Sequence, residues 1–236
     1  MRTVALFITC LADQFYPRVG VAVTKVLEKL DCRVEFPKDQ TCCGQPFFNN
    51  GFEKEARRLA QRMEDIFAGY EYVVTPSGSC CAMLRQHHGG AMGKKTYEFS
   101  EFLSGILGFE FSSVQLPRPQ SLVYHYTCHL RNLGIGDRSG QTLGRIGNIK
   151  LLPLDRADQC CGFGGTFAVQ YPAISGAIAE DKARCIAASG APTLICDDAG
   201  CAMNISGMCH RKNIPIRVMH TAELLAEAMG LDTSRW

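Results

Sequence analysis

Short runs of apolar, strand-forming residues alternate along the chain with longer segments whose apolar residues repeat at helical spacing. The strand candidates are residues 3–9, 32–36, 71–75, 121–127, 149–154, 192–196 and 214–218. Strands that alternate with helices predict an α/β fold with mostly parallel sheets. Ligands of such sheets bind beyond the carboxyl ends of the strands, so the residues that follow each run are candidates for chemistry.

Three of the intervening segments place their apolar residues on one face of a helix. The three faces consist of Val19, Val23, Val26, Leu27 and Leu30; of Ala56, Leu59, Ala60, Met63, Ile66 and Phe67; and of Ile174, Ala177, Ile178 and Ile186.

The chain repeats a pattern of strand and cysteine. Residues 3–10 (TVALFITC) and 121–128 (SLVYHYTC) are both apolar runs that end in Thr-Cys. Cys128 follows Cys10 by 118 positions, and Cys160 follows Cys42 by the same 118. This spacing indicates an internal duplication. We therefore predict two Rossmann-like halves related by a pseudo-twofold axis, with metal sites at the strand carboxyl ends near the interface.

A polar stretch with two prolines, residues 110–121 (EFSSVQLPRPQS), separates the two copies of the pattern. We expect it to be a linker between a first repeat domain, residues 1–112, and a second, residues 119–236. The chain has 236 residues, of which 46% are apolar, so it can bury a substantial core.

The net charge of +2 and the lack of a basic block give no support to nucleic-acid binding. No apolar run approaches the length of a membrane span, about 20 residues. The apolar run after Arg2 is too short for an export signal, and we interpret it as the first strand.

Thirteen cysteines are a high count for such a chain. Two adjacent cysteines suit a mutual disulfide poorly, because their Cα atoms lie about 3.8 Å apart and bridged pairs need about 4.4 Å. A reducing cytoplasm with metal-bound thiolates explains the cysteines better than a secreted disulfide framework.

Each half offers three cysteine elements: one after a strand, a Cys-Cys-Gly motif, and one in a turn after a later strand. Four thiolates are the number that holds a four-iron cluster or a structural zinc. Cys81 competes with Cys80 for the last position of the first half, and we prefer Cys80 because its turn matches the turn before Cys201. The candidate ligands are Cys10, Cys42, Cys43, Cys80, Cys128, Cys160, Cys161 and Cys201.

The remaining candidates carry weaker signals. We expect Cys32, Cys185, Cys196 and Cys209 to be core residues, since buried free cysteine is common. His125 and His129 flank Cys128, and each is as compatible with a structural role as with a functional one. His129 and Arg131 could donate to a substrate carboxylate or tune a cluster. We expect His220 to begin a helix.

The segments LFITCLAD, CCGQP, TPSGSC, CCGFGGTF and GCAMNISG resemble the cysteine-rich CCG-domain family, which includes one of the subunits of heterodisulfide reductase and the iron–sulfur subunit of glycolate oxidase. Within the family, the likeness is greatest to the lactate-utilization members. It implies a cytoplasmic protein with one or two iron–sulfur clusters of 4Fe-4S type that transfers electrons as L-lactate, or another small 2-hydroxy acid, is oxidised. It also implies two partners: a ferredoxin-like iron–sulfur protein and a third lactate-utilization subunit.

The chain departs from the wider family at one position in each half. The family pattern ends each repeat in C-x-x-C, which implies five cysteines and a pair of fused non-cubane clusters. Ser77 and Asp198 stand where the first cysteine of that motif would be. A cubane cluster, an oxygen ligand from either residue, and zinc in one half all remain compatible with the sequence.

Three functions follow from these residues. The first is a redox subunit, which would not complete a reaction alone because the chain has no recognisable flavin or NAD motif. The second is a module, stabilised by zinc or a cluster, that assembles such a complex. The third is a thiol or heterodisulfide reductase subunit that acts through a pair such as Cys80 and Cys81.

Overall fold

The structure is a computed structural model that describes residues 1–135 and 138–234. It contains two four-stranded sheets in which every strand pair is parallel. The first sheet has the order β2-β1-β3-β4 and the second has the order β6-β5-β7-β8. The common order confirms the predicted α/β fold with two similar halves. The strands are β1 (Arg2–Leu6), β2 (Cys32–Glu35), β3 (Tyr72–Thr75), β4 (Thr96–Glu98), β5 (Gln115–His125), β6 (Gly147–Leu151), β7 (Thr193–Cys196) and β8 (Arg217–Met219).

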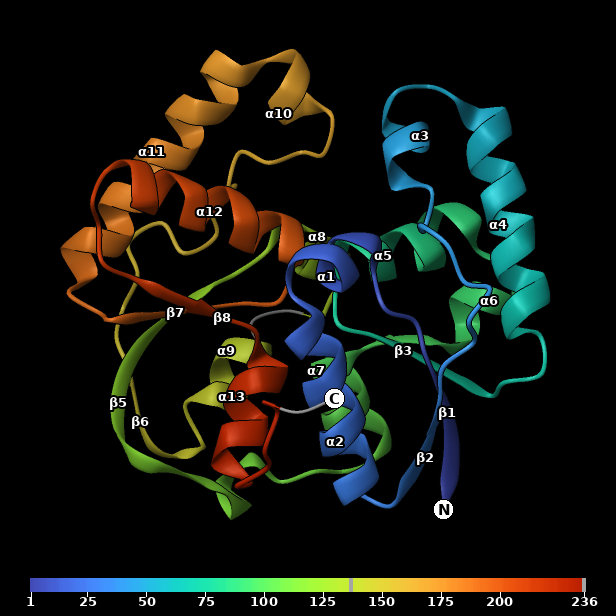
Figure 1. Cartoon of the computed structure of the whole chain (residues 1–236), viewed down its shortest axis with the longest axis horizontal. Coiled ribbons are helices and arrows are strands. Elements are labelled where there is room, and N and C mark those ends of the chain that lie inside the picture. Colours follow the sequence, from blue (N-terminus) through green and yellow to red (C-terminus); the bar gives the residue numbers. More distant parts are fainter. Residues whose placement is uncertain (136–137, 235–236) are drawn as a thin grey trace.

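Helices surround both sheets (Figure 1). Those before β5 are α1 (Cys10–Phe15), α2 (Pro17–Lys29), α3 (Gln45–Asn49), α4 (Glu53–Phe67), α5 (Gly78–Ala82), the π-helix η1 (Met83–His88), α6 (Gly90–Lys95), α7 (Phe99–Glu101), the π-helix η2 (Phe102–Ile106) and the 3-10 helix η3 (Phe111–Ser113). Those after β5 are α8 (Cys128–Asn132), α9 (Arg138–Leu143), α10 (Phe167–Gln170), α11 (Pro172–Ser189), α12 (Ala199–Arg211) and α13 (Thr221–Ala228).

The two halves pack on each other in a reciprocal way. Helix α13 of the second half contacts α2 of the first, and α7 of the first contacts α9 of the second. Likewise α5 contacts α8, and α12 contacts α1. One hydrophobic core contains buried residues from both halves. Figure 1 shows α1, α5, α8 and α12 close to one another in the middle of the molecule. The helices that follow β1, β3, β5 and β7 therefore meet between the halves.

All seven predicted strands occur, with shifted ends, and β4 was not predicted. The predicted linker is wrong over residues 115–121, because these residues belong to β5. The strand pairs Gln115 with Gly147 and then Gln120 with Ile149, so its register shifts between these points. Both prolines lie in the shifted stretch, where a strand tolerates a residue without an N–H group.

The first two predicted helical faces are largely buried, in α2 and α4. The third is wrong in part, because Ile174 is 54% exposed and Ala177 is exposed. Helix α11 buries a neighbouring face instead, which includes Ala179, Lys182 and Ala183. A lysine on this face finds hydrogen-bond partners inside the protein, which hydrophobic periodicity does not reveal.

Two further predictions are confirmed. Cys32, Cys185, Cys196 and Cys209 are buried. His220 is the N-cap of α13, where its ring accepts a hydrogen bond from the N–H of Ala222. Among the described residues, no helix is long and apolar enough to cross a membrane.

Candidate metal centre

The eight predicted cysteine ligands line a single cavity of about 370 Å³. Each half contributes one cysteine from the helix after its first strand, two from its CCG loop, and one from the helix after its third strand. The carboxyl ends of β1, β3, β5 and β7 thus bring together residues that are up to 191 positions apart in sequence (Cys10 to Cys201). The first half places Cys80 at the cavity, whereas Cys81 is fully buried and is not part of the lining.

The CCG glycine has the same conformation in both halves. Gly44 has φ 85° and Gly162 has φ 83°, which lie in the left-handed region that favours glycine. In both loops a side chain also binds the carbonyl of the second cysteine: the ring of His88 lies 2.6 Å from the Cys43 oxygen, and the amide of Asn204 donates to the Cys161 oxygen at 2.8 Å. These contacts fix a turn that directs both thiols of a pair to one side.

Sulfur atoms approach one another closely in both halves. In the first half the Sγ atoms of Cys10 and Cys42 are 3.7 Å apart. In the second half those of Cys161 and Cys201 are 2.9 Å apart. The backbone N–H of Gly162 also donates to the sulfur of Cys160 at 3.3 Å. Thiols at such distances share a proton, and binding of a metal to these sulfurs would release it.

The first cysteine of each CCG pair favours the thiolate. The pKa of Cys42 is lowered to about 3, because Cys10 and then Cys43 donate hydrogen bonds to its sulfur. The pKa of Cys160 is lowered to about 2 by the same kind of contact from Cys128 and Cys161. The thiolate is the form of cysteine that binds metals. The electrostatics of the two halves are alike in this respect.

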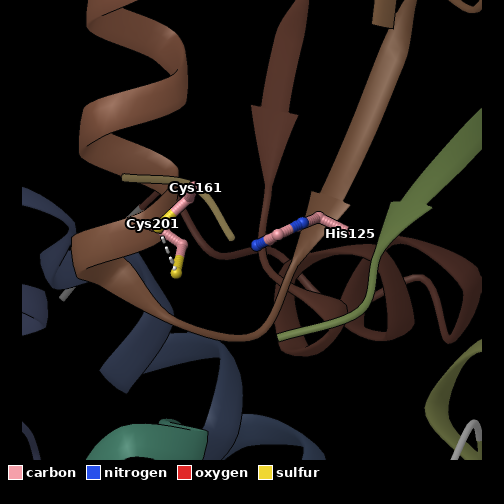
Figure 2. Close-up of side chains that lie close together, drawn as sticks. All are labelled: His125, Cys161 and Cys201. Atoms are coloured by element: carbon pink, nitrogen blue, oxygen red, sulfur yellow. Dashed lines mark hydrogen bonds between the residues drawn. The ribbon is translucent and has the colours of Figure 1, made fainter. Parts of the chain in front are cut away.

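His125 lies at the end of β5 and is only 1% exposed. Its ring is directed toward Cys161 and Cys201 (Figure 2), and the ligand atoms of the three residues all lie within 4.8 Å of one another. Burial, and then the nearby Lys182, lower the pKa of the ring to about 3, so the imidazole is neutral. The sequence interpretation left His125 outside the ligand set, although its position three residues before Cys128 was a usable signal.

Ser77 and Asp198 join the two halves. Ser77 Oγ donates to Asp198 Oδ2 at 3.0 Å, and the N–H of Ser79 donates to the same oxygen at 3.0 Å. Each residue also caps its own helix: Ser77 accepts from the N–H of Cys80 and Asp198 from that of Gly200. Both residues line the cavity, but their oxygen atoms already hold hydrogen bonds within the protein. Their first role is therefore to hold α5 and α12 together.

The two predicted catalytic residues lie in different places. His129 lines the cavity, with Nδ1 at 3.6 Å from Cys128 Sγ and Nε2 at 3.2 Å from the amide nitrogen of Gln45. Arg131 is not among the lining residues. Its guanidinium donates to Asp158 at 3.2 Å and lies 5.9 Å from the centre of the Tyr126 ring. His129 thus lies beside the cysteines, whereas Arg131 links α8 to the second CCG loop.

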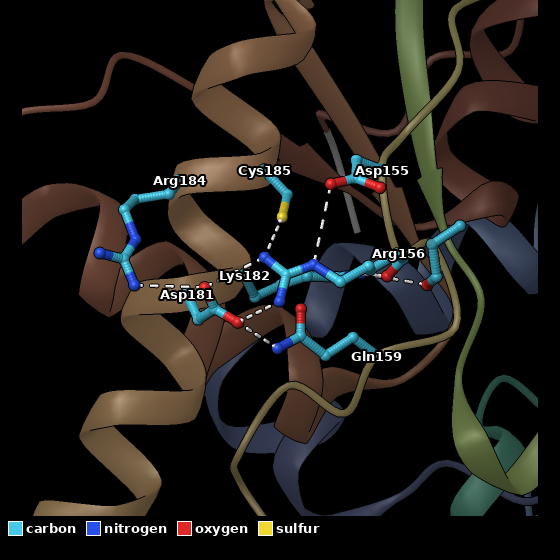
Figure 3. A network of polar contacts seen from close by, with 8 residues as sticks. Asp155, Arg156, Gln159, Asp181, Lys182, Arg184 and Cys185 are labelled. Carbon is cyan, nitrogen blue, oxygen red and sulfur yellow. Dashed lines mark hydrogen bonds and ion pairs between the residues drawn. The ribbon is translucent and has the colours of Figure 1, made fainter.

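A charged network holds the second CCG loop (Figure 3). Arg156 donates to both carboxylate oxygens of Asp181 and to the sulfur of Cys185 at 3.0 Å. Lys182, which is 0% exposed, donates to the carbonyls of Arg156 at 2.6 Å and Ala157 at 3.1 Å. These contacts attach the residues before Cys160 to helix α11.

The donor set fits a metal centre bound by sulfur. Thiolates are soft ligands that select iron–sulfur clusters, zinc or copper(I) rather than calcium or magnesium. All thirteen cysteines are free of disulfides in the described structure, so the eight at the cavity are available as donors.

Comparison with known proteins gives the family. A sequence model described as "CCG: Cysteine-rich domain" matches residues 4–85 and 122–206. The chain is 41% identical to "Lactate utilization protein A" of Exiguobacterium sp., over 97% of this chain and 99% of that protein. It is 44% identical to the protein of the same name from Geobacillus kaustophilus, over 94% and 98%. A solved glutamate racemase from Francisella tularensis aligns over 100% of this chain and 84% of its own, with 12% identity and a TM-score of 0.38, which says nothing about function. The duplicated CCG loops, and the two matches that cover both of them, show that this chain belongs to the cysteine-rich CCG family.

Proposed function

We propose that this chain is the iron–sulfur subunit of a complex that oxidises L-lactate or a related 2-hydroxy acid. One observation carries the proposal: eight cysteines from both halves line one cavity. The relatives are named for lactate utilization, which favours lactate as the substrate. An iron–sulfur group bound there would accept and release single electrons.

The eight cysteines form two sets of four, with one set in each half. Cys10, Cys42, Cys43 and Cys80 would hold one group, and Cys128, Cys160, Cys161 and Cys201 a second. The low pKa of Cys42 and Cys160 means that one thiolate per half needs no strong base to form. Cys81 is excluded from this set because it faces the protein interior, where burial raises the pKa of its thiol. The same burial disfavours Cys80 and Cys81 as a reactive thiol pair.

His129 would tune the sulfur next to it. The amide nitrogen of Gln45 can only donate, so Nε2 of His129 accepts and the ring proton lies on Nδ1, which faces Cys128 Sγ at 3.6 Å. An N–H donor aimed at a ligand sulfur stabilises the electron-rich state of a metal centre. His129 also lines the cavity, so its ring is placed to meet a substrate carboxylate there. Arg131 has no such position and is not assigned a part in binding.

The other parts of the reaction belong to partner proteins. The sequence contains no dinucleotide-binding motif, so electrons must be exchanged with other subunits. We propose a ferredoxin-like iron–sulfur protein and a third subunit of the same system as those partners, acting together in the cytoplasm.

Metal and sulfide analysis of the anaerobically purified protein tests the proposal. We expect a brown protein with broad absorbance near 400 nm, and equimolar iron and acid-labile sulfide. Cys43→Ser and Cys161→Ser should each remove about half of the iron. Cys209→Ser is the matched control, because this buried cysteine lies outside the cavity. Zinc without sulfide would support an assembly module instead, and a colourless protein without metal would overturn the proposal.

A further inference from the structure

One of the differences between the two halves lies beside Cys161 and Cys201. The offset of 118 that relates Cys10 to Cys128 also relates Phe7 to His125. Phe7 is fully buried and packs edge-to-face on Phe67, with ring centres 6.0 Å apart. Its place in the first half is therefore explained by hydrophobic packing. His125 occupies the matching place in the second half with a polar ring.

Packing alone does not explain His125. In the described structure neither ring nitrogen has a hydrogen-bond partner of ordinary geometry, although the backbone of Ala157 lies near the ring. Leaving a buried polar group without a partner costs free energy, so such groups are rare and need an explanation. A neutral imidazole without a partner is also the form in which histidine binds metals.

The neighbours of His125 are sulfur donors. Cys161 and Cys201 offer their Sγ atoms within 4.8 Å of the ring nitrogen (Figure 2). Both belong to the cysteine elements that the two halves repeat, since one lies in the CCG loop and the other in the first turn of α12. Within the described residues, no other group of three histidine, cysteine or acidic side chains brings its ligand atoms so close together.

We propose that His125 is a metal ligand of the second half, acting with Cys161 and Cys201, so that the two halves hold chemically different metal sites. The inference deepens the proposed function, and rests on it for the identity of the metal. A neutral nitrogen that takes the place of one of the four thiolates of this half leaves less negative charge on the metal than four thiolates. Replacement of thiolate by histidine raises the reduction potential of an iron–sulfur centre. Electrons that enter this chain would then reside preferentially in the second half.

Pulsed electron paramagnetic resonance of the reduced, anaerobically reconstituted protein tests this assignment. We expect the nitrogen hyperfine coupling of a bound histidine in the wild type and in His129→Gln, and its loss in His125→Phe. Phenylalanine reproduces the first half at this position, which favours folding of the variant, and circular dichroism checks it. His125→Cys should keep a cluster and lower the reduction potential of one centre. Coupling that is absent in the wild type, or lost only in His129→Gln, would overturn the inference while leaving the proposed function intact.

Cobalt(II) separates failure of the inference from failure of the proposed function. If reconstitution yields no iron and sulfide, the reduced metal-free protein is titrated with cobalt(II) and followed by its sulfur-to-metal absorption. His125→Phe should weaken binding about 10–100-fold, and Phe7→Leu should leave it unchanged. That result would retain His125 as a ligand and reject the iron–sulfur function. Equal binding by wild type and His125→Phe would reject the ligand as well.

Discussion

The two CCG loops form nearly the same turn, yet different interactions hold them. In the first loop a neutral side chain makes three contacts: Gln40 accepts from the N–H of Ile8 at 2.9 Å and donates to the carbonyls of Leu6 at 3.1 Å and Pro37 at 2.9 Å. The exposed Arg62 of α4 adds one hydrogen bond to the carbonyl of Asp39 at 3.1 Å. The second is fixed by ions, in which Lys182 and Arg156 join the loop to α11. Duplication has therefore preserved the position of the thiols while the supporting contacts have changed. A difference in stability between the halves should therefore come from these supporting contacts and not from the cysteines.

The largest difference is expected at the CCG glycines. A Cβ atom on Gly162 would lie 2.6 Å from the carbonyl oxygen of Ser175, whereas on Gly44 the nearest atom would be 3.5 Å away. Both positions have positive φ, which costs an L-residue about 1–2 kcal/mol. The clash adds about 1–3 kcal/mol at Gly162 only. Urea unfolding of the reduced proteins should show Gly162→Ala losing about 3 kcal/mol and Gly44→Ala about 1 kcal/mol. Equal losses would contradict the difference in packing.

Removal of the supporting side chains should loosen one loop at a time. Lys182→Met removes a charged donor from the carbonyls of Arg156 and Ala157, which keep the N–H groups of Gln159 and Tyr126 as donors, and the loss should cost about 2 kcal/mol. Gln40→Met removes the corresponding contacts of the first loop, and the loss in the free energy of unfolding should be similar or smaller. Hydrogen exchange measured by mass spectrometry reads each loop separately. We expect faster exchange near residue 157 in Lys182→Met and near residue 40 in Gln40→Met, and loosening of both loops in either variant would refute independent support.

Removal of the Asp198 side chain should cost more stability than removal of the Ser77 side chain, although the two share one contact. Asp198→Ala leaves the N–H groups of Ser79 and Gly200 without their acceptor, so we expect a loss of about 1–2 kcal/mol in the free energy of unfolding. Ser77→Ala removes a cap and one donor, for about 1 kcal/mol. The double variant should lose less than the sum of the two. A strictly additive result would mean that the two helices are not coupled here.

The smallest effect is expected from acid. Hydrogen bonds from Arg156, and then from Gln159, hold the pKa of Asp181 well below its usual range. A carboxyl with a lowered folded-state pKa contributes stability above its unfolded pKa of about 3.9, and this contribution is lost as the pH falls toward the folded pKa. The free energy of unfolding of the wild type, measured from pH 5 to pH 2, should therefore fall more steeply than that of Asp181→Asn. High salt should reduce the difference between the pH dependences of the two proteins, because Asp181 is partly exposed and its charge is screened.

Sequence reasoning located the thiols because two local signals agreed. Apolar runs predicted parallel strands, and offsets of 118 residues, or 121 between Cys80 and Cys201, showed that cysteines follow equivalent strands in both halves. Strand ends converge in any parallel sheet, so Cys10, Cys80, Cys128 and Cys201 could be brought together without knowledge of the packing. The prediction that they hold iron rests on resemblance and chemistry, and is still to be measured.

Other features depend on packing between segments and gave no local signal. Strand β4 has three residues, too few for a pattern, and β5 runs through two prolines that normally indicate a loop. The buried Lys182 interrupts the apolar face of α11, because its partners are carbonyls of a distant loop. Ser77 and Asp198 were recognised as substitutions, but their contact across the halves required the relative placement of both sheets. His125 could have been noted by alignment with Phe7.

The contact between Ser77 and Asp198 also bears on how such a protein can arise. Both residues cap the helix after the third strand of their half, so they are equivalent positions that meet each other. In a dimer of identical subunits, a residue at such a place meets its own copy, and two carboxylates would repel. A single fused chain allows one position to become a donor and the other an acceptor. Fusion thus permits a pairing of hydroxyl with carboxylate at the centre of the molecule that a symmetric ancestor could not have formed.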